Sequence, residues 1–95
     1  MQVNFAIKKF LQSIQENYSE KTVYKYDETF WVFAEYLNNW CKIQNIEDIS
    51  EHQFREFLSW WYIRKHLGSS GSKAVMAITH LKRFLKWLGD EYQIV

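Results

Sequence analysis

No proline occurs anywhere in the 95 residues of this chain, and only 3 glycines are present. Proline and glycine are the residues that most often form tight turns, and average usage would supply several of each. A chain with so few of them lacks the turn residues that a many-stranded β protein needs. The sequence therefore predicts an all-α fold.

Aromatic side chains are the main source of a hydrophobic core. The chain contains 5 Trp, 6 Tyr and 7 Phe, which together are 19% of its residues, and each can bury on the order of 150–250 Å². A chain of this length buries only about two-thirds of the surface that it exposes when unfolded. Large side chains compensate for the small size, and we expect a single domain over residues 1–95.

Cys41 is the only cysteine, which excludes an internal disulfide and a cysteine-based metal site and favours a reducing compartment. The longest nearly apolar run, residues 57–63, is far shorter than the roughly 20 residues of a membrane span. The N-terminus lacks the pattern of a signal peptide. We expect a cytoplasmic protein that does not enter a membrane.

The net charge of +1 conceals an uneven distribution along the chain. Residues 1–56 carry a net charge of −3, whereas residues 57–89 contain no carboxylate. The basic residues of this second stretch are Arg64, Lys65, Lys73, Lys82, Arg83 and Lys86. Such a stretch predicts a positive surface that meets phosphate; the alternative is a solvated face from which acidic residues are absent by chance.

Apolar spacing predicts four helices. The first ends near Asn17, and its apolar face consists of Ile7, Phe10, Leu11, Ile14 and Tyr18. The second begins after Ser19, a good N-cap residue, with Tyr18 and Val23 placed to form a hydrophobic staple. It runs to about Cys41, and its buried stripe is Tyr26, Phe30, Phe33, Leu37 and Trp40.

The third helix begins with a capping box formed by Ser50 and Gln53, flanked by a staple between Ile49 and Phe54. Its apolar face is Phe54, Phe57, Leu58 and Trp61. Residues 67–72 form a turn in which Ser70 or Ser72 caps the last helix. That helix ends near Gly89 and is expected to bury Ala74, Ile78, Leu81, Leu85 and Leu88. The predicted architecture is a bundle of four helices.

The sequence contains no recognisable catalytic or metal-binding set. His52, His66 and His80 lie fourteen residues apart, without the i, i+4 pairing of a helical metal site, and are expected to be surface or capping residues. Gly68 and Gly71 lack the flanking residues of a phosphate-binding loop. We therefore expect no enzyme activity on small molecules, no cofactor and no metal.

Two outward stripes indicate contact with partners. On the last helix, the predicted outward residues are Met76, His80, Arg83 and Trp87, with Lys73 beside them. They could lie along a nucleic-acid groove, although Trp87 and Met76 could instead pack against the first helix or a neighbouring domain. On the second helix, Tyr24 and Trp31 lie opposite the core among carboxylates, which favours protein contact there.

Three segments together resemble a known family. Residues 18–26 and the following Phe30 and Phe33 resemble the pattern Ser-x-x-Thr-x-x-x-Tyr-x-x-x-Leu-x-x-Phe, which opens the second helix of the N-terminal core-binding domain of tyrosine recombinases, the phage integrase family. Residues 49–58 are similar to the next element of that domain, and residues 81–88 are similar to its closing helix. The likeness covers nearly the whole chain in the correct order.

The resemblance implies a four-helix, SAM-like domain that clamps one side of a recombination site on double-stranded DNA. In that family the second and fourth helices approach the major groove and its phosphates. The positions implied here are Ser19, Lys21, Thr22, Lys25, Tyr26, Lys73, Lys82 and Arg83. Lys82 is expected nearer the buried side than Arg83. The fourth helix lacks the Ser-x-x-Thr-x-x-Arg opening usual in the family, which predicts weak, salt-sensitive binding.

The resemblance also implies that the catalytic Arg, His and Tyr belong to a separate C-terminal domain, so we expect that this chain does not cut DNA. The expected partners are double-stranded DNA, that catalytic domain and other recombinase protomers, with no membrane and no small-molecule substrate. The function expected is DNA binding during site-specific integration or recombination. The alternative is a helical protein-interaction module that does not bind DNA.

Overall fold

The structure is a computed structural model that describes the backbone of residues 1–61 and 71–92 and the side chains of residues 1–59 and 75–92. Four helices dominate these ranges: α1 (Val3–Gln15), α2 (Glu20–Glu35), α3 (Glu51–Glu56) and α5 (Gly71–Tyr92). Within the described ranges no β-strand is formed, and Gln2 and Asn45 make one isolated bridge. The all-α, four-helix prediction is confirmed.

Short helical turns extend two of these helices. A π-helical turn, Tyr36–Trp40, continues α2, and a second, Phe57–Trp61, continues α3. A 3₁₀ turn, Ile46–Asp48, lies between them. After the first π turn, Lys42 adopts a φ of 59° and the chain turns back toward the start of α1.

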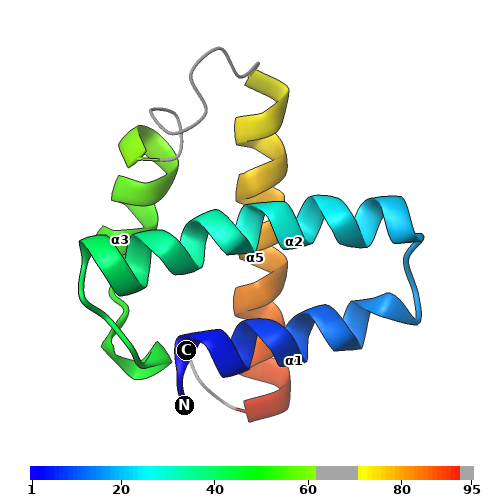
Figure 1. Cartoon of the computed structure of the whole chain (residues 1–95), viewed down its shortest axis with the longest axis horizontal. Coiled ribbons are helices and arrows are strands. Elements are labelled where there is room, and N and C mark those ends of the chain that lie inside the picture. The colour runs from blue at the N-terminus through cyan, green and yellow to red at the C-terminus, as the bar shows by residue number, and fades with distance from the viewer. Residues whose placement is uncertain (62–70, 93–95) are drawn as a thin grey trace.

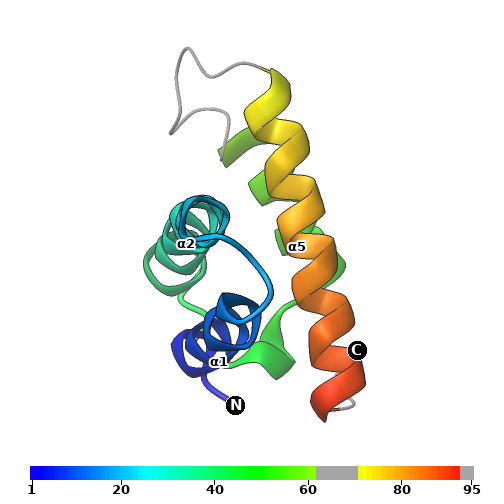
Figure 2. The same ribbon diagram turned by 90° about the vertical axis from the view of Figure 1, so that its right-hand side faces the viewer.

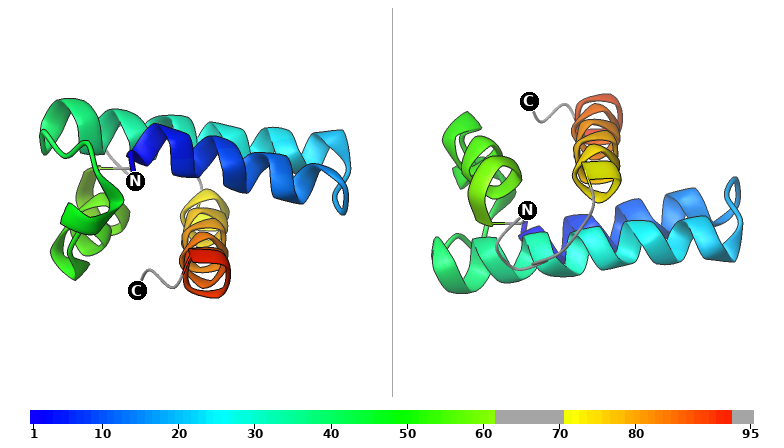
Figure 3. Two further views of the ribbon diagram at one scale, coloured as in Figure 1. Left: turned by 90° about the horizontal axis from the view of Figure 1, so that it is seen from below. Right: turned by 90° about the horizontal axis from the view of Figure 1, so that it is seen from above.

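The helices form two layers. Helices α1 and α2 lie side by side and antiparallel, and α5 crosses behind both of them (Figure 1). Seen from the side, α5 stands beside the α1–α2 pair (Figure 2), and from below and above α3 and α5 occupy the same side of that pair (Figure 3). The molecule is correspondingly flat, with extents of 35 × 32 × 18 Å.

Capping residues set the helix starts that the sequence predicts. Ser19 precedes α2, and its hydroxyl oxygen accepts a hydrogen bond from the backbone N–H of Thr22 at 3.3 Å. Ser50 precedes α3, where its backbone N–H donates to Gln53 Oε1 at 2.7 Å as part of a capping box. These bonds satisfy backbone or side-chain groups that a helix start leaves without partners, and both predicted caps are confirmed.

Aromatic rings join the two layers. Phe10 of α1, Phe30 of α2 and Phe84 of α5 are all buried and pack edge to face, with ring centroids 5.1 to 5.4 Å apart. Phe33 extends this cluster toward α3 by packing on Phe57 at 4.9 Å. Burying each ring contributes about 1.5–3 kcal/mol, and each well-placed pair about 0.5–1.5 kcal/mol more. One aromatic cluster therefore holds α5 against the α1–α2 pair.

The predicted buried face of α5 is only partly correct. Leu81 and Leu88 are buried as predicted, together with Ala77, His80 and Phe84, whereas Ile78 is 37% exposed and Leu85 is 39% exposed. The side chain of Ala74 lies outside the described residues. Packing selects the arc in which Ala77 allows close approach and Phe84 fills the space between α1 and α2. The helix also continues past Gly89 to Tyr92.

The ends of the other helices differ from prediction in smaller ways. Helix α1 ends at Gln15, two residues before Asn17. Trp40, expected in the buried stripe of α2, is 56% exposed, whereas Leu37 is fully buried. The π turn is the physical reason, because its wider winding rotates the residues that follow out of the 3.6-residue period of α2. Of the predicted turn at residues 67–72, residues 67–70 lie outside what the structure describes, as does the side chain of Trp61. Gly71 and Ser72 are already part of α5, so the alternative that Ser72 precedes and caps this helix is wrong.

Candidate nucleic-acid interface

The first turns of α2 present hydroxyl and ammonium groups at one end of the helical pair. The hydroxyl of Ser19 donates to Thr22 Oγ1 at 3.1 Å while also capping the helix. Lys21 and Lys25 follow, one turn apart on the same side of α2, and both are exposed. The positive end of the helix dipole adds to their charge. This end of α2 is therefore suited to meet an anion.

Tyr26 connects the start of α2 to α5. Its ring is almost completely buried, and its hydroxyl oxygen accepts a hydrogen bond from Arg83 Nη1 at 2.6 Å. The same guanidinium nitrogen donates to the hydroxyl of Tyr18 at 3.2 Å, and the guanidinium carbon lies 5.9 Å from the centre of the Tyr18 ring. Arg83 is thus fixed by two tyrosines that precede it by more than fifty residues.

His80 occupies the crossing of α2 and α5. It is 5% exposed, its ring stacks on Tyr26 with centroids 3.8 Å apart, and its Nδ1 lies 2.9 Å from Thr29 Oγ1 in a buried hydrogen bond. The prediction that His80 is an outward surface residue is wrong. A buried histidine is acceptable here because the ring has an aromatic partner and its nitrogen has a hydroxyl partner.

The pKa of His80 is affected by its burial and by the charges near the crossing of α2 and α5. Desolvation by burial, followed by the positive charges of Arg83 and then Lys25, lowers the pKa of His80 from 6.5 to about 4. The imidazole is therefore neutral at physiological pH. Lys25 and Arg83 come from different helices, and the charge of each acts on this one ring.

The remaining basic positions lie along α5. Lys82, Arg83 and Lys86 are all exposed, so the structure does not separate Lys82 from Arg83 by burial as expected. The side chain of Lys73 lies outside the described residues. Arg83 lines a groove of about 360 Å³ between the end of α1 and α5, whose other polar lining residues are Tyr18, Lys86, Asp90 and Glu91.

Trp87 shows that one of the two alternatives for the outward stripe is correct. Its ring packs on Phe10 of α1 at 5.5 Å and on Phe84 at 6.2 Å, and it is partly buried against the core. Met76 is half-buried. Among the side chains of the predicted outward stripe that the structure describes, only that of Arg83 is exposed.

Helices α2 and α5 thus form a basic corner, which we define by Lys21, Lys25, Lys82, Arg83 and Lys86. Figure 3 shows that the start of α2 extends past its crossing with α5. Sequence reasoning predicted four of these five residues, and also Tyr26, as DNA contacts, but it did not predict the supporting roles of Tyr18, Thr29 and His80. The phenol of Tyr18 and the Thr29–His80 pair carry no local signal, because their partners lie on another helix.

The described residues contain no group of three or more His, Cys, Asp or Glu side chains that could hold a metal ion. His52 is exposed beside Glu56, with Nε2 and Oε2 3.8 Å apart, and His66 lies outside the described residues. None of the helices in the described ranges combines the length and the apolar character needed to cross a membrane. The geometry of these ranges offers contact surfaces and supplies no catalytic constellation that would define a reaction.

The described helices form an all-α domain in which the long last helix crosses an antiparallel pair. A family model for the phage integrase N-terminal SAM-like domain matches residues 7–91. The chain belongs to this family, as the three sequence segments predict, and its role is related to that of tyrosine recombinases in DNA integration. The matching region of the family is the N-terminal domain and not the catalytic domain. Searches of curated proteins and of solved structures gave no match.

Proposed function

We propose that residues 1–95 form a single core-binding domain, which binds double-stranded DNA and clamps one side of a recombination site. The chemistry would be performed by a C-terminal catalytic domain of the recombinase, in the cytoplasm, together with other recombinase protomers. The domain itself would be a binding module without enzyme activity, metal or cofactor. Family membership supports the general role, and the basic corner supports DNA as the ligand.

The observation that carries the proposal is the fixed position of Arg83. A guanidinium that donates to two phenol oxygens and lies near one of the rings is already oriented before any ligand arrives. Guanidinium groups recognise phosphate through paired N–H donors. Both bonds to the tyrosines come from Nη1 of Arg83, so Nη2 and Nε are not used by the tyrosines. Lys25 is the sequence neighbour of Tyr26 on α2, and its charge and that of Arg83 both act on the ring of His80.

The other residues implied by the family have distinct roles under this proposal. Lys21, Lys25 and Lys82 are exposed and would contact phosphates. The hydroxyls of Ser19 and Thr22 would contact the backbone while they cap α2. Tyr26 would act through Arg83, because its hydroxyl is already engaged. Lys73 remains part of the proposed DNA contact on the basis of the resemblance alone.

The test is fluorescence anisotropy of a labelled duplex of about 30 base pairs, titrated with the protein at several salt concentrations. The double variant Lys82→Ala, Arg83→Ala should bind more weakly, and the slope of log K against log salt should fall by about 0.9 for each phosphate that is no longer neutralised. Lys9→Gln is the matched control, since Lys9 is an exposed cation that lies over the ring of Phe5 on α1. That variant should leave the slope unchanged.

Because Arg83 also supports Tyr18 and Tyr26, the single variant Lys82→Ala and the melting temperature of each variant complete the test. An unchanged salt slope in the folded double variant would contradict the basic corner as the DNA site. No binding of the duplex by the wild-type chain even at low salt would favour the protein-interaction alternative. A scrambled duplex shows whether any sequence is read.

A further inference from the structure

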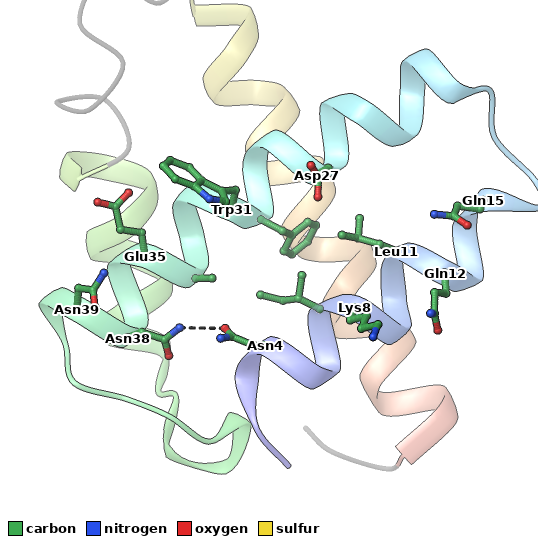
Figure 4. A pocket seen from close by; sticks show the side chains of 13 residues that line it. Asn4, Lys8, Leu11, Gln12, Gln15, Asp27, Trp31, Glu35, Asn38 and Asn39 are labelled. Carbon is green, nitrogen blue, oxygen red and sulfur yellow. Dashed lines mark hydrogen bonds between the residues drawn. The ribbon is translucent and has the colours of Figure 1, made fainter.

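A long groove follows the outer face of the α1–α2 pair, on the side turned away from α5 (Figure 4). Two adjoining hollows of about 770 and 550 Å³ share Leu11, Gln15 and Asp27 among their lining residues. They therefore form one continuous channel between the two helices, which we call the outer groove. The proposed DNA contacts do not use this groove, because the basic corner lies where α2 meets α5.

The residues that line the outer groove follow the spacing of a helix-packing seam. Along α2 and its π turn they alternate by four and three positions: Glu20, Tyr24, Asp27, Trp31, Ala34 and Asn38. Along α1 the same alternation recurs: Asn4, Lys8, Leu11 and Gln15. Residues three and four apart lie on one helix face, and this alternation is the one by which helices pack along a shared seam. Two such rows side by side form a groove into which a third helix can pack.

The dimensions of the rows fit a helix of ordinary length. From Glu20 to Asn38 the chain advances about 27 Å at about 1.5 Å per residue, which is about 18 residues of a docked helix. Leu11, Phe30 and Ala34 form an apolar floor, and the small side chain of Ala34 allows close approach. An extended strand would not match this period, because its side chains repeat every two residues.

Two aromatic side chains on the rim have little contact with the rest of the chain. Tyr24 is 68% exposed and Trp31 is 69% exposed, and they stand seven residues apart on either side of Asp27. Tryptophan and tyrosine are the residues that most often anchor a protein interface. Their exposure on the seam, and not on the core side of α2, indicates a surface that becomes covered in a complex.

The charge of the outer groove selects the kind of helix that fits. Glu20, Asp27 and Glu35 line it, against the single cation Lys8. Asp27 lies at the centre, lines both hollows and makes no hydrogen bond or ion pair with any described residue. Phosphate would be repelled here, so the groove does not suit DNA. Lysine or arginine side chains would find carboxylates and, at Trp31, an aromatic face.

We propose that the outer groove binds a basic amphipathic helix of a partner protein. That helix presents apolar residues at i, i+3 or i+4 and i+7 to the floor of the groove, and a lysine or arginine to Asp27. Trp31 and Tyr24 close over its two sides. This surface and the basic corner occupy different faces of α2, so the domain can bind DNA and the partner helix at the same time.

The probe is an acetylated and amidated helical peptide of about 18 residues, with leucine on its seam and lysine beside the leucines, and isothermal titration calorimetry measures its affinity. A peptide with glutamate in place of each lysine is its partner probe. The wild-type chain should bind the lysine peptide and not the glutamate peptide. Trp31→Ala should weaken binding of the lysine peptide about tenfold or more. Asp27→Lys should weaken binding of the lysine peptide by a similar factor and should allow the glutamate peptide to bind.

The control is Asp48→Lys, which makes the same charge reversal at an exposed position outside the groove and should leave peptide affinity unchanged. Failure to bind the lysine peptide at about 1 mM, or equal binding of both peptides, would overturn the proposal. Sedimentation showing self-association that Trp31→Ala abolishes would assign the groove to a second copy and also overturn it. Duplex DNA binding of Trp31→Ala and Asp27→Lys is measured separately, so failure of this proposal is distinguished from failure of the DNA-binding proposal.

Discussion

The two faces of the α1–α2 pair carry similar aromatic residues and use them in opposite ways. On the inner face, Phe30 and Phe33 are completely buried against rings supplied by α1, α3 and α5. On the outer face, Tyr24 and Trp31 are more than two-thirds exposed and alternate with carboxylates. Residue type alone does not decide which face becomes core. The decisive difference is the presence of carboxylates, whose burial without partners would be costly.

Removing a ring from the inner face should have the largest effect on stability. Phe84→Ala leaves a cavity beside Phe10 and Phe30 and should lower the free energy of unfolding by about 3–5 kcal/mol. Urea denaturation followed by circular dichroism measures the change. Leu85→Ala is the matched variant on the next residue of α5, and its partial exposure predicts a much smaller loss. Equal losses for the two variants would show that the orientation of α5 is different from the one described.

The inner face should also lose stability in acid through His80. Its pKa is about 4 in the folded protein against 6.5 ordinarily, so the unfolded chain binds the proton more readily. The contribution of neutral His80 is fully present above about pH 6.5 and declines as pH falls toward 4. The free energy of unfolding that is lost when this contribution disappears completely is about 3 kcal/mol.

Urea denaturation of the wild-type chain at pH 7 and pH 4.5 tests this expectation. Lys25 and Arg83 are the cations that act on the ring. His80→Gln removes the titrating group, so its stability should depend less on pH than that of the wild-type chain. Identical pH dependence of the two proteins would refute the role given to His80.

The smallest effect on stability is expected on the outer face. Trp31→Ala removes the largest kind of side chain in the protein, yet it should change the free energy of unfolding by less than about 0.5 kcal/mol, because the ring is mostly solvated. Denaturation at pH 7 checks this value against Phe84→Ala. A loss of several kcal/mol would mean that Trp31 belongs to the core, and the contrast between the two faces would no longer hold.

Sequence periodicity predicted α2 well and α5 poorly, for a physical reason. On α2 the stripe Tyr26, Phe30, Phe33 and Leu37 lies opposite charged residues, so only one face can be buried. On α5 apolar residues surround most of the helix, and two neighbouring arcs are almost equally hydrophobic. Packing against α1 and α2 chooses between them, and that information is not local. Trp40 was misplaced because a π turn changes the period without changing the composition.

The basic residues of the candidate site could be predicted from the sequence, whereas the contacts that hold them in place could not. Lys21, Lys25, Lys82 and Arg83 follow from a carboxylate-free stretch and from family motifs. The buried hydrogen bond between Thr29 and His80 joins residues 51 positions apart, and the bond from Arg83 to Tyr18 joins residues 65 positions apart. Such pairs form only once the helices have crossed.

The hold of Tyr18 and Tyr26 on Arg83 has a consequence for entropy. A free arginine side chain has about 2 kcal/mol of rotamer entropy to lose when it is immobilised. Here much of that loss occurs during folding, when the guanidinium meets the two phenol oxygens. A ligand that reaches Arg83 therefore finds a single orientation already selected. The bond to Tyr18 ties the segment joining α1 and α2 to the last helix, and the bond to Tyr26 ties α2 to it. The orientation of this cation therefore depends on the packing of all these elements.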